Sequence, residues 1–294
     1  MRIVILGAGH AGVTLSYFLK KSGVDITVIE KDFVGSGETG YSTGIFPMDP
    51  KIFDFYKEIE EYTLHYFKPI VYDHIKEGEK GESVYVDGYN YAYYISIVLE
   101  KEGVKFEVMN PFHGIEFDDK KITGIKTDRG FFDGDIFIVA AGGSTPFIVK
   151  DFENLEGIKF KWVRSLLLKP VKRFLQQVIY YDEFVIKPEG EERLILRENQ
   201  GISVNPQEDV VNKTRGVDEE FYSVVYEYLE KEHPELTDAS IERGWATLCM
   251  EAEEPMKKSR KFNNLYFFAG FGCMGFRVIP KLAKKMVKEV LQND

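Results

Sequence analysis

The chain has 294 residues, enough for one large domain or two modest ones and for a substantial buried core. Hydrophobic residues make up 44% and charged residues 29%, proportions that exclude a disordered or collagen-like chain. The 48 acidic residues outnumber the 38 basic ones, and the net charge of −10 argues against a nucleic-acid partner bound through a broad basic surface. The two cysteines are too few for a disulfide framework or a four-thiolate metal site.

Two apolar runs bear on where the protein resides. The run 3–19 follows a basic start, but Gly7, Gly9 and Gly12 interrupt it and no small-residue cleavage pattern follows, so no signal peptide is predicted. The run 136–149 is too short to cross a bilayer. We therefore expect a cytoplasmic protein with no membrane span and no bound metal.

Hydrophobic patterning predicts alternating strands and helices. The chain opens with a strand at 3–6, a helix after the glycines that ends near Gly23, and a second strand at 26–29. A loop rich in Gly, Ser and Thr follows at 33–43. The later predicted elements are a helix at 91–101, a strand at 104–109, short antiparallel strands within 115–132, a strand at 136–141, alternating strands and turns within 160–196, a helix at 218–232, a strand at 265–268 and an amphipathic helix at 280–291.

Glycines at the first strand-helix junction form a dinucleotide-binding fingerprint. Gly7, Gly9 and Gly12 have the spacing G-x-G-x-x-G between a strand and a helix, and Glu30 ends the next strand. The first glycine permits a tight turn, the second lets a pyrophosphate approach the backbone, and the third lets helix and strand pack closely. Amides at the helix start would bind the pyrophosphate, and the Glu30 carboxylate would accept hydrogen bonds from ribose hydroxyls and repel a 2′-phosphate. FAD or NAD is therefore favoured over NADP, and a glycine-rich turn with only a packing role is the alternative.

Together with further motifs, this fingerprint makes the chain resemble FAD-dependent oxidoreductases of the D-amino acid oxidase superfamily. The resemblance rests on four stretches in order: the triad at 7–12, the stretch 30–46, the apolar strand and glycines at 136–143, and the stretch 264–277. The pattern is closest to glycine and sarcosine oxidases and to dye-linked proline dehydrogenases. It implies an FAD-dependent oxidoreductase.

The resemblance implies which residues contact FAD. Amides of 272–275, at a helix start, are expected to stabilise negative charge on a reduced flavin. The implied cofactor-binding residues are Gly7, Gly9, His10, Ala11, Gly12, Glu30, Lys31, Ser36, Gly37, Thr39, Gly44, Ile45, Gly142, Gly272, Met274, Gly275, Phe276 and Arg277.

The resemblance also implies an α/β fold with two parts. One is a discontinuous Rossmann-like FAD-binding domain of the glutathione reductase type, and the other is a smaller, sheet-based substrate domain. We expect the FAD-binding domain to comprise 1–45, 86–150 and 245–294, and the substrate domain to comprise 46–85 and 151–244. Ligands should lie between the two domains.

For the reaction, the resemblance implies oxidation of a small amine or an amino or imino acid by hydride transfer to flavin N5. Many members hold the substrate carboxylate with an arginine after Trp-Ala-Gly-Leu, but this chain has Cys249 at the end of the corresponding run 245–249. Arg277 takes the position of a carboxylate-binding lysine of sarcosine-oxidase-like members and is expected to anchor the substrate anion. Phe46 is expected beside the flavin ring. Cys249 is expected near the flavin, either covalently linked to it or unlinked, with a small buried thiol that only packs as the alternative.

Two other functions stay open. The missing arginine is also compatible with a dehydrogenase of the same superfamily that acts on a 2-hydroxy acid or another alcohol. Alternatively, the chain holds flavin as one subunit of a multi-chain dehydrogenase and depends on a partner subunit. In each case a small molecule is the substrate, and the electron acceptor is either oxygen or a separate carrier.

Overall fold

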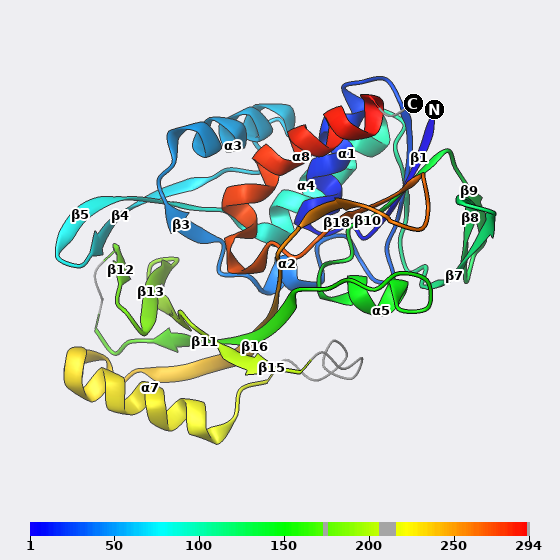
Figure 1. Ribbon diagram of the computed structural model, residues 1–294. Coiled ribbons are helices and arrows are strands. Elements are labelled where there is room, and N and C mark those ends of the chain that lie inside the picture. The colour runs from blue at the N-terminus through cyan, green and yellow to red at the C-terminus, as the bar shows by residue number, and fades with distance from the viewer. Residues whose placement is uncertain (173–175, 206–215, 293–294) are drawn as a thin grey trace.

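A computed structural model describes residues 1–172, 176–205 and 216–292. The fold is built around a mainly parallel sheet (Figure 1). This sheet comprises β1 (Arg2–Leu6), β2 (Asp25–Ile29), β6 (Lys105–Glu107), β10 (Ile136–Val139), β17 (Met256–Lys258) and β18 (Leu265–Phe268). Its strands follow the order β17-β18-β10-β1-β2-β6, with β17 alone antiparallel to its neighbour among these described strands. Ile5 of β1 lies between Ile138 of β10 and Val28 of β2, so the first strand is central, as expected for an N-terminal strand-helix-strand unit.

Both faces of this first sheet are covered, which explains its unbroken apolar runs. Ile3 and Ile5 of β1 join the cluster formed with the helices, and Val4 and Leu6 join a second cluster on the opposite face. The helices that cover the first face are α1 (His10–Lys20), α3 (Pro50–Tyr62), α4 (Gly88–Lys101) and α8 (Gly275–Gln292), as Figure 1 shows. The second face carries the small antiparallel sheet of β7 (Phe112–Asp118), β8 (Lys121–Thr127) and β9 (Gly130–Asp133), together with α5 (Thr145–Val149).

A larger sheet forms the other half of the molecule. Its strands are β3 (Ile45–Pro47), β4 (Ile70–Lys76), β5 (Glu79–Tyr85), β11 (Ile158–Lys169), β12 (Val178–Tyr180), β13 (Phe184–Glu189), β14 (Arg193–Glu198), β15 (Ile202–Val204) and β16 (Ser240–Ala252). The amphipathic helix α7 (Glu219–Glu232) covers one face, where its Phe221 and Val225 meet Leu166 and Leu196 of the sheet. The mixed α/β class predicted from the sequence is confirmed.

Four short helical elements complete the described fold. They are the helix α2 (Glu38–Tyr41) and the 3₁₀ turns η1 (Gly142–Ser144), η2 (Pro234–Leu236) and η3 (Gly272–Met274). The proposed division into five segments stays a prediction. Near one predicted boundary, residues 245–252 belong to β16 and pair with β11 in the larger sheet. The predicted division assigns these residues to the FAD-binding domain.

Helix α3 and the β4–β5 hairpin are among the elements that the sequence patterns do not predict. Ile52, Phe55, Tyr56 and Ile59 are buried at helical spacing on α3, and the Asp49 carboxylate caps its start by accepting from the Lys51 amide at 3.2 Å. The helical spacing of these apolar residues is present in the sequence, but the charged residues between them obscure it.

One buried hydroxyl replaces a hydrogen bond that is missing within α8. Pro280 lies inside this helix and has no N–H to donate to the carbonyl of Phe276, one turn earlier. The hydroxyl of Tyr56 on α3 donates to that carbonyl at 2.7 Å, and it lies 3.2 Å from Nε2 of His10 on α1. The rings of His10 and Phe276 stack with their centres 4.4 Å apart. Tyr56 thus joins the beginnings of α1 and α8.

We expect the variant Tyr56→Phe to lose about 1–3 kcal/mol of unfolding free energy, because it leaves the buried Phe276 carbonyl without a donor. The measurement is urea denaturation followed by circular dichroism. Tyr228→Phe is the matched control, since Tyr228 is also buried but its hydroxyl has no partner among the described residues. Equal stability changes in the two variants would contradict the assigned role of Tyr56.

Candidate active site

A cavity of about 350 Å³ lies where the carboxyl ends of β1, β2 and β10 approach the larger sheet. Its walls come from the β1–α1 turn, the segment 37–43, the stretch 140–144, the loop 270–276, and strands β11, β14 and β16. Ligands of open α/β sheets bind at the carboxyl ends of the strands, so this is the expected place for a site. The cavity is therefore shared by the two halves of the molecule.

The β1–α1 turn approaches its neighbours too closely for side chains. Gly7 has φ +105° in the left-handed region, and a Cβ at Gly12 would lie 1.9 Å from the Gly7 carbonyl oxygen. At Gly9, a Cβ would lie 3.0 Å from the Thr39 hydroxyl oxygen. The first and third glycines of the triad are thus required by the fold itself.

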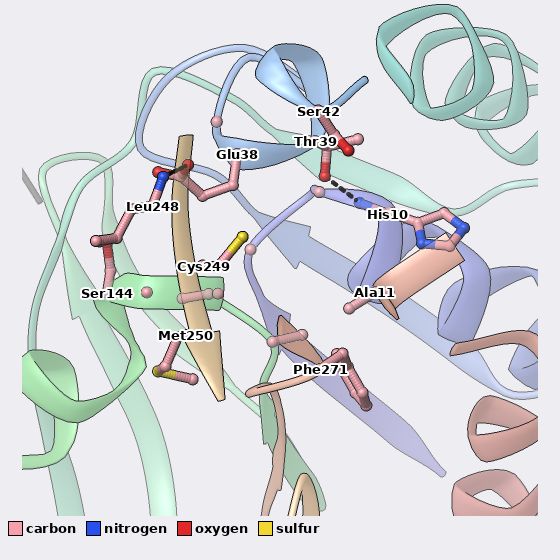
Figure 2. Close-up of a pocket in the computed structure, with 18 of the residues that line it drawn as sticks. His10, Ala11, Glu38, Thr39, Ser42, Ser144, Leu248, Cys249, Met250 and Phe271 are labelled. Atoms are coloured by element: carbon pink, nitrogen blue, oxygen red, sulfur yellow. Dashed lines mark hydrogen bonds between the residues drawn. The ribbon is translucent and has the colours of Figure 1, made fainter. Parts of the chain in front are cut away.

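The start of α1 is left available to an anion. The helix has no acidic residue in its first turn and no side-chain cap at Gly9, while the His10 amide donates to the Thr39 hydroxyl at 2.8 Å (Figure 2). The remaining amides and the helix dipole favour negative charge at this end. Burial lowers the pKa of His10 to about 3, so its ring is neutral at pH 7 and adds no charge.

Glu30 directly follows β2 and contacts the β1–α1 turn. Its carboxylate accepts from the Ala8 amide at 2.8 Å and from the Asp32 amide at 3.0 Å. Burial of the carboxyl group raises the pKa of Glu30, and the two backbone donors oppose that rise. The carboxylate still lines the cavity, where it can accept further hydrogen bonds from hydroxyl groups.

The segment around α2 is fastened to β16 of the larger sheet. The Glu38 carboxylate accepts from the Leu248 amide at 2.7 Å, as Figure 2 shows. The carbonyl of Tyr41 accepts from the Trp245 indole at 2.9 Å and from the Thr247 hydroxyl at 2.8 Å. These bonds hold the segment 38–41 over the cavity without any contribution from a ligand.

The loop before α8 bends sharply beside β16. Gly270 and Gly272 have φ +87° and +57°, and a Cβ at Gly272 would lie 2.6 Å from the Glu251 side chain. Gly275 and Phe276 begin α8 at the cavity, so a second helix start is directed into it. Backbone amides there favour negative charge in the same way as those of α1.

The larger sheet supplies the polar wall. Side chains alternate along its strands, so Leu166 and Leu196 face α7 while Ser165 and Arg197 face the cavity. Ser165 and Arg197 are paired across β11 and β14. The Arg197 guanidinium donates to the Asn199 side-chain oxygen at 3.2 Å and makes no ion pair within the described ranges 1–172, 176–205 and 216–292.

Several buried polar atoms at this cavity have no hydrogen-bond partner in the described part of the chain. They are Nδ1 of His10, Oγ1 of Thr43, Nδ2 of Asn110 and Nε of Arg197. Leaving such groups unpaired costs about 1–3 kcal/mol each, so a polar ligand in the cavity would relieve that cost. Their distribution around the whole cavity indicates a ligand with polar groups along its length.

The structure brings together many of the residues singled out from the sequence. The predicted residues that line the cavity are Gly7, Gly9, His10, Ala11, Glu30, Lys31, Gly37, Thr39, Gly142, Gly272, Gly275, Phe276 and Cys249. Those that do not line it are Gly12, Ser36, Gly44, Ile45, Phe46, Met274 and Arg277.

The residues outside the lining have other places in the fold. Phe46 is buried in the helix-side core, where its ring lies 6.0 Å from that of Tyr56. Arg277 is exposed on α8. A Cβ at Gly44 would lie 1.9 Å from the Val86 carbonyl oxygen, so this glycine is needed for a backbone contact. The cation that the cavity does contain on its larger-sheet wall is Arg197, which the sequence reading did not single out.

Other lining residues, both apolar and polar, were not among the expected site residues. The polar ones include Asn110, Thr43, Ser165 and Thr247, and Cys273 was expected there only through its backbone amide. Arg197 directly follows the apolar run of β14, but which face of the sheet its side chain occupies depends on which face α7 covers. No group of three or more His, Cys, Asp or Glu is placed to hold a metal ion in the described ranges. Within the same ranges, no helix is long and apolar enough to cross a membrane.

The glycine turn, the acid at the end of β2 and the two helix starts define a dinucleotide-binding α/β protein. The model of the family of FAD dependent oxidoreductases matches residues 2–67 and 79–289, and the chain belongs to this family. The resemblance to the D-amino acid oxidase superfamily is therefore confirmed, and the protein is an FAD-dependent oxidoreductase.

Solved structures with the same fold cover the whole chain. L-proline dehydrogenase from P. horikoshii has a TM-score of 0.81 and 20% identity, with 100% of this chain and 94% of that chain covered. Glycine oxidase from Bacillus cereus has a TM-score of 0.77 and 16% identity, with 100% and 95% covered. A D-amino acid dehydrogenase of Azorhizobium caulinodans is 48% identical over 42 residues, which is 14% of this chain and only 10% of that protein.

The cavity fits the cofactor of the family. The tight turn at Gly7 and Gly12 and the lack of a side chain at Gly9 let a phosphate reach the start of α1, and the unpartnered polar atoms offer hydrogen bonds farther along. The proposed holders of FAD are the amides after Gly9 for the pyrophosphate, Glu30 for ribose hydroxyls, and the loop 272–275 for the flavin ring.

We expect Gly12→Ala to weaken FAD binding on the order of tenfold or more, because its Cβ would force the turn away from the Gly7 carbonyl. The measurement is titration of the apoprotein with FAD by flavin fluorescence. Gly114→Ala on β7 is the control, since its Cβ would meet no atom within 4 Å. Wild-type FAD affinity in the Gly12 variant would show that the turn does not hold the cofactor.

Proposed function

We propose that the protein oxidises a small amino or imino acid, with Arg197 holding the substrate carboxylate. The observation that carries this proposal is the buried, unpartnered Nε of Arg197 at the cavity wall, in a chain whose described residues offer this guanidinium no carboxylate. A guanidinium presents parallel N–H donors that match both oxygens of a carboxylate. The names of the similar proteins, glycine oxidase, L-proline dehydrogenase and D-amino acid dehydrogenase, support a substrate of this class.

Arg197 takes over the role that the sequence suggested for Arg277. Arg277 is exposed and lies outside the cavity lining, whereas Arg197 shares the wall with Ser165 and Thr247. The Thr247 hydroxyl is already donated to Tyr41, so it helps to fix the wall and is not free to donate to a substrate.

The side chains and backbone of the protein bind the substrate and orient it. FAD, when bound, accepts two electrons from the substrate, which is the chemistry that the protein itself does not supply. Arg197 would fix the carboxylate and thereby the position of the alpha carbon. Burial keeps His10 neutral, with a pKa of about 3, so the ring provides a neutral polar surface between the start of α1 and that of α8. Apolar lining from Val163 and Leu248 helps to exclude water around the reacting carbon.

A 2-hydroxy acid remains the second candidate substrate class, because its carboxylate would fit Arg197 equally well. A flavin-holding subunit that works only with a partner chain is the third reading. The covalent link through Cys249 also stays a prediction, since its sulfur lines the cavity (Figure 2). Each of these readings gives a different outcome in one experiment.

That experiment is anaerobic reduction of the FAD-loaded protein, followed by the loss of flavin absorbance. We expect bleaching by one or more small amino or imino acids and none by the corresponding 2-hydroxy acids. Bleaching by hydroxy acids alone would overturn the amino acid assignment. Absence of bleaching by every compound until a second protein is added would favour the subunit reading. Yellow colour that stays with acid-precipitated protein would indicate covalent flavin.

We expect Arg197→Met to raise the KM for the reducing substrate about 10- to 150-fold, the equivalent of ~1.5–3 kcal/mol for hydrogen bonds to a charged group. FAD content should not change, because the proposed cofactor contacts lie on other walls. Arg277→Met is the matched control and should leave the KM unchanged. If the effects of the two variants were reversed, Arg277 would be the anchor.

A further inference from the structure

The two cysteines of the chain come from distant positions but meet at the cavity. Cys249 lies on β16 and is buried, and Cys273 lies in η3 and is exposed. Both line the cavity, and Figure 2 shows the Cys249 side chain projecting from β16 toward the start of α1. The sequence contains no other cysteine.

The backbone brings the two segments that carry these cysteines together. The Ala252 amide donates to the Gly270 carbonyl at 2.9 Å, and Glu251 and Phe271 form an antiparallel bridge. Cys249 precedes Glu251 by two residues on β16, Cys273 follows Phe271 by two residues in η3, and a hydrogen bond between the two thiols shifts the pKa of each.

We propose that Cys249 and Cys273 form a redox-active dithiol in the cavity wall, which a small-molecule disulfide oxidises reversibly to an intramolecular disulfide. The proposal rests on the juxtaposition of the two side chains and on the accessibility of one of them. It does not depend on which substrate the flavin site oxidises.

The surroundings give the two sulfurs different roles. The hydrogen bond from Cys249 lowers the pKa of Cys273, and the nearby Arg197 guanidinium acts in the same direction. The same hydrogen bond, together with burial, raises the pKa of Cys249. The exposed Cys273 is therefore the sulfur that ionises first and attacks, because thiolates are the nucleophilic form.

The chemistry balances in two exchange steps. The Cys273 thiolate attacks one sulfur of the small disulfide, forming a mixed disulfide and releasing one thiolate. Cys249 gives its proton to that thiolate and attacks the Cys273 sulfur, and the second small thiolate leaves and takes up the proton that Cys273 lost. The protein loses two electrons and two protons, and the small disulfide becomes two thiols. The new bond would tie β16 covalently to the turn that leads into α8.

The test treats the FAD-loaded protein with excess oxidised glutathione, counts thiols after denaturation, and measures the intact mass. In the wild type we expect two titratable thiols to fall to none with no glutathione attached, and dithiothreitol to restore both. Cys249→Ser should accumulate a stable glutathione adduct at Cys273, because no second thiol can release it. Cys273→Ser should react more slowly, on the order of tenfold or more, since its remaining thiol is buried.

Three outcomes would overturn the dithiol. These are retention of both thiols in the wild type, a stable glutathione adduct in the wild type, and equal reaction rates for the two single variants. A covalent flavin on Cys249 would appear before treatment as one missing thiol and an added mass, and it would also exclude the disulfide. Cys249→Ala gives the same readout if serine is poorly accommodated at the buried position. Because thiols and not turnover are measured, the result is independent of the proposed substrate.

Discussion

The cavity keeps its shape because one buried hydroxyl joins the two helices that begin at it. Tyr56 supplies the hydrogen bond that Pro280 cannot give to the Phe276 carbonyl, and the same hydroxyl lies against the His10 ring. The stacked rings of His10 and Phe276 then set the spacing between the starts of α1 and α8. Both starts present backbone amides to the cavity, where they favour the negative charges of a phosphate and of a reduced flavin. Because Pro280 leaves a carbonyl of α8 without its helical donor, a residue of a third helix, α3, can bond to that carbonyl next to the site.

The two halves of the molecule contribute different chemistry to the cavity. The parallel sheet contributes backbone groups, because its glycine turns leave amides exposed and bring main chain close to any ligand. The larger sheet contributes side chains, since α7 covers one of its faces and leaves Ser165, Arg197 and Cys249 on the other. The α2 segment spans the two halves through its hydrogen bonds to β16. A long cofactor held by backbone and a small anion held by a guanidinium both fit this division.

Local sequence patterns predict the half of the site that depends on backbone. The triad from Gly7 to Gly12 is recognisable because a tight turn, a strand and a helix are all encoded within a few residues. The wall from the larger sheet was not predictable in the same way. Whether Arg197 or Leu196 faces the ligand depends on where α7 packs, which is a contact across the fold and not a property of β14. The meeting of Cys249 with Cys273 likewise depends on a contact between distant segments, which the bridge between Glu251 and Phe271 holds together. Arg277 was singled out by its position in a motif, but its side chain is exposed on α8.

The central claim is that the substrate end of this flavin cavity is defined by Arg197. The most direct measurement is a crystal structure of the FAD-loaded protein with a small carboxylate that is not oxidised, such as acetate, bound at the flavin. The account predicts both carboxylate oxygens within hydrogen-bond distance of the Arg197 guanidinium, with the carboxylate beside Ser165. A carboxylate held instead by Arg277, or bound away from the larger-sheet wall, would contradict it.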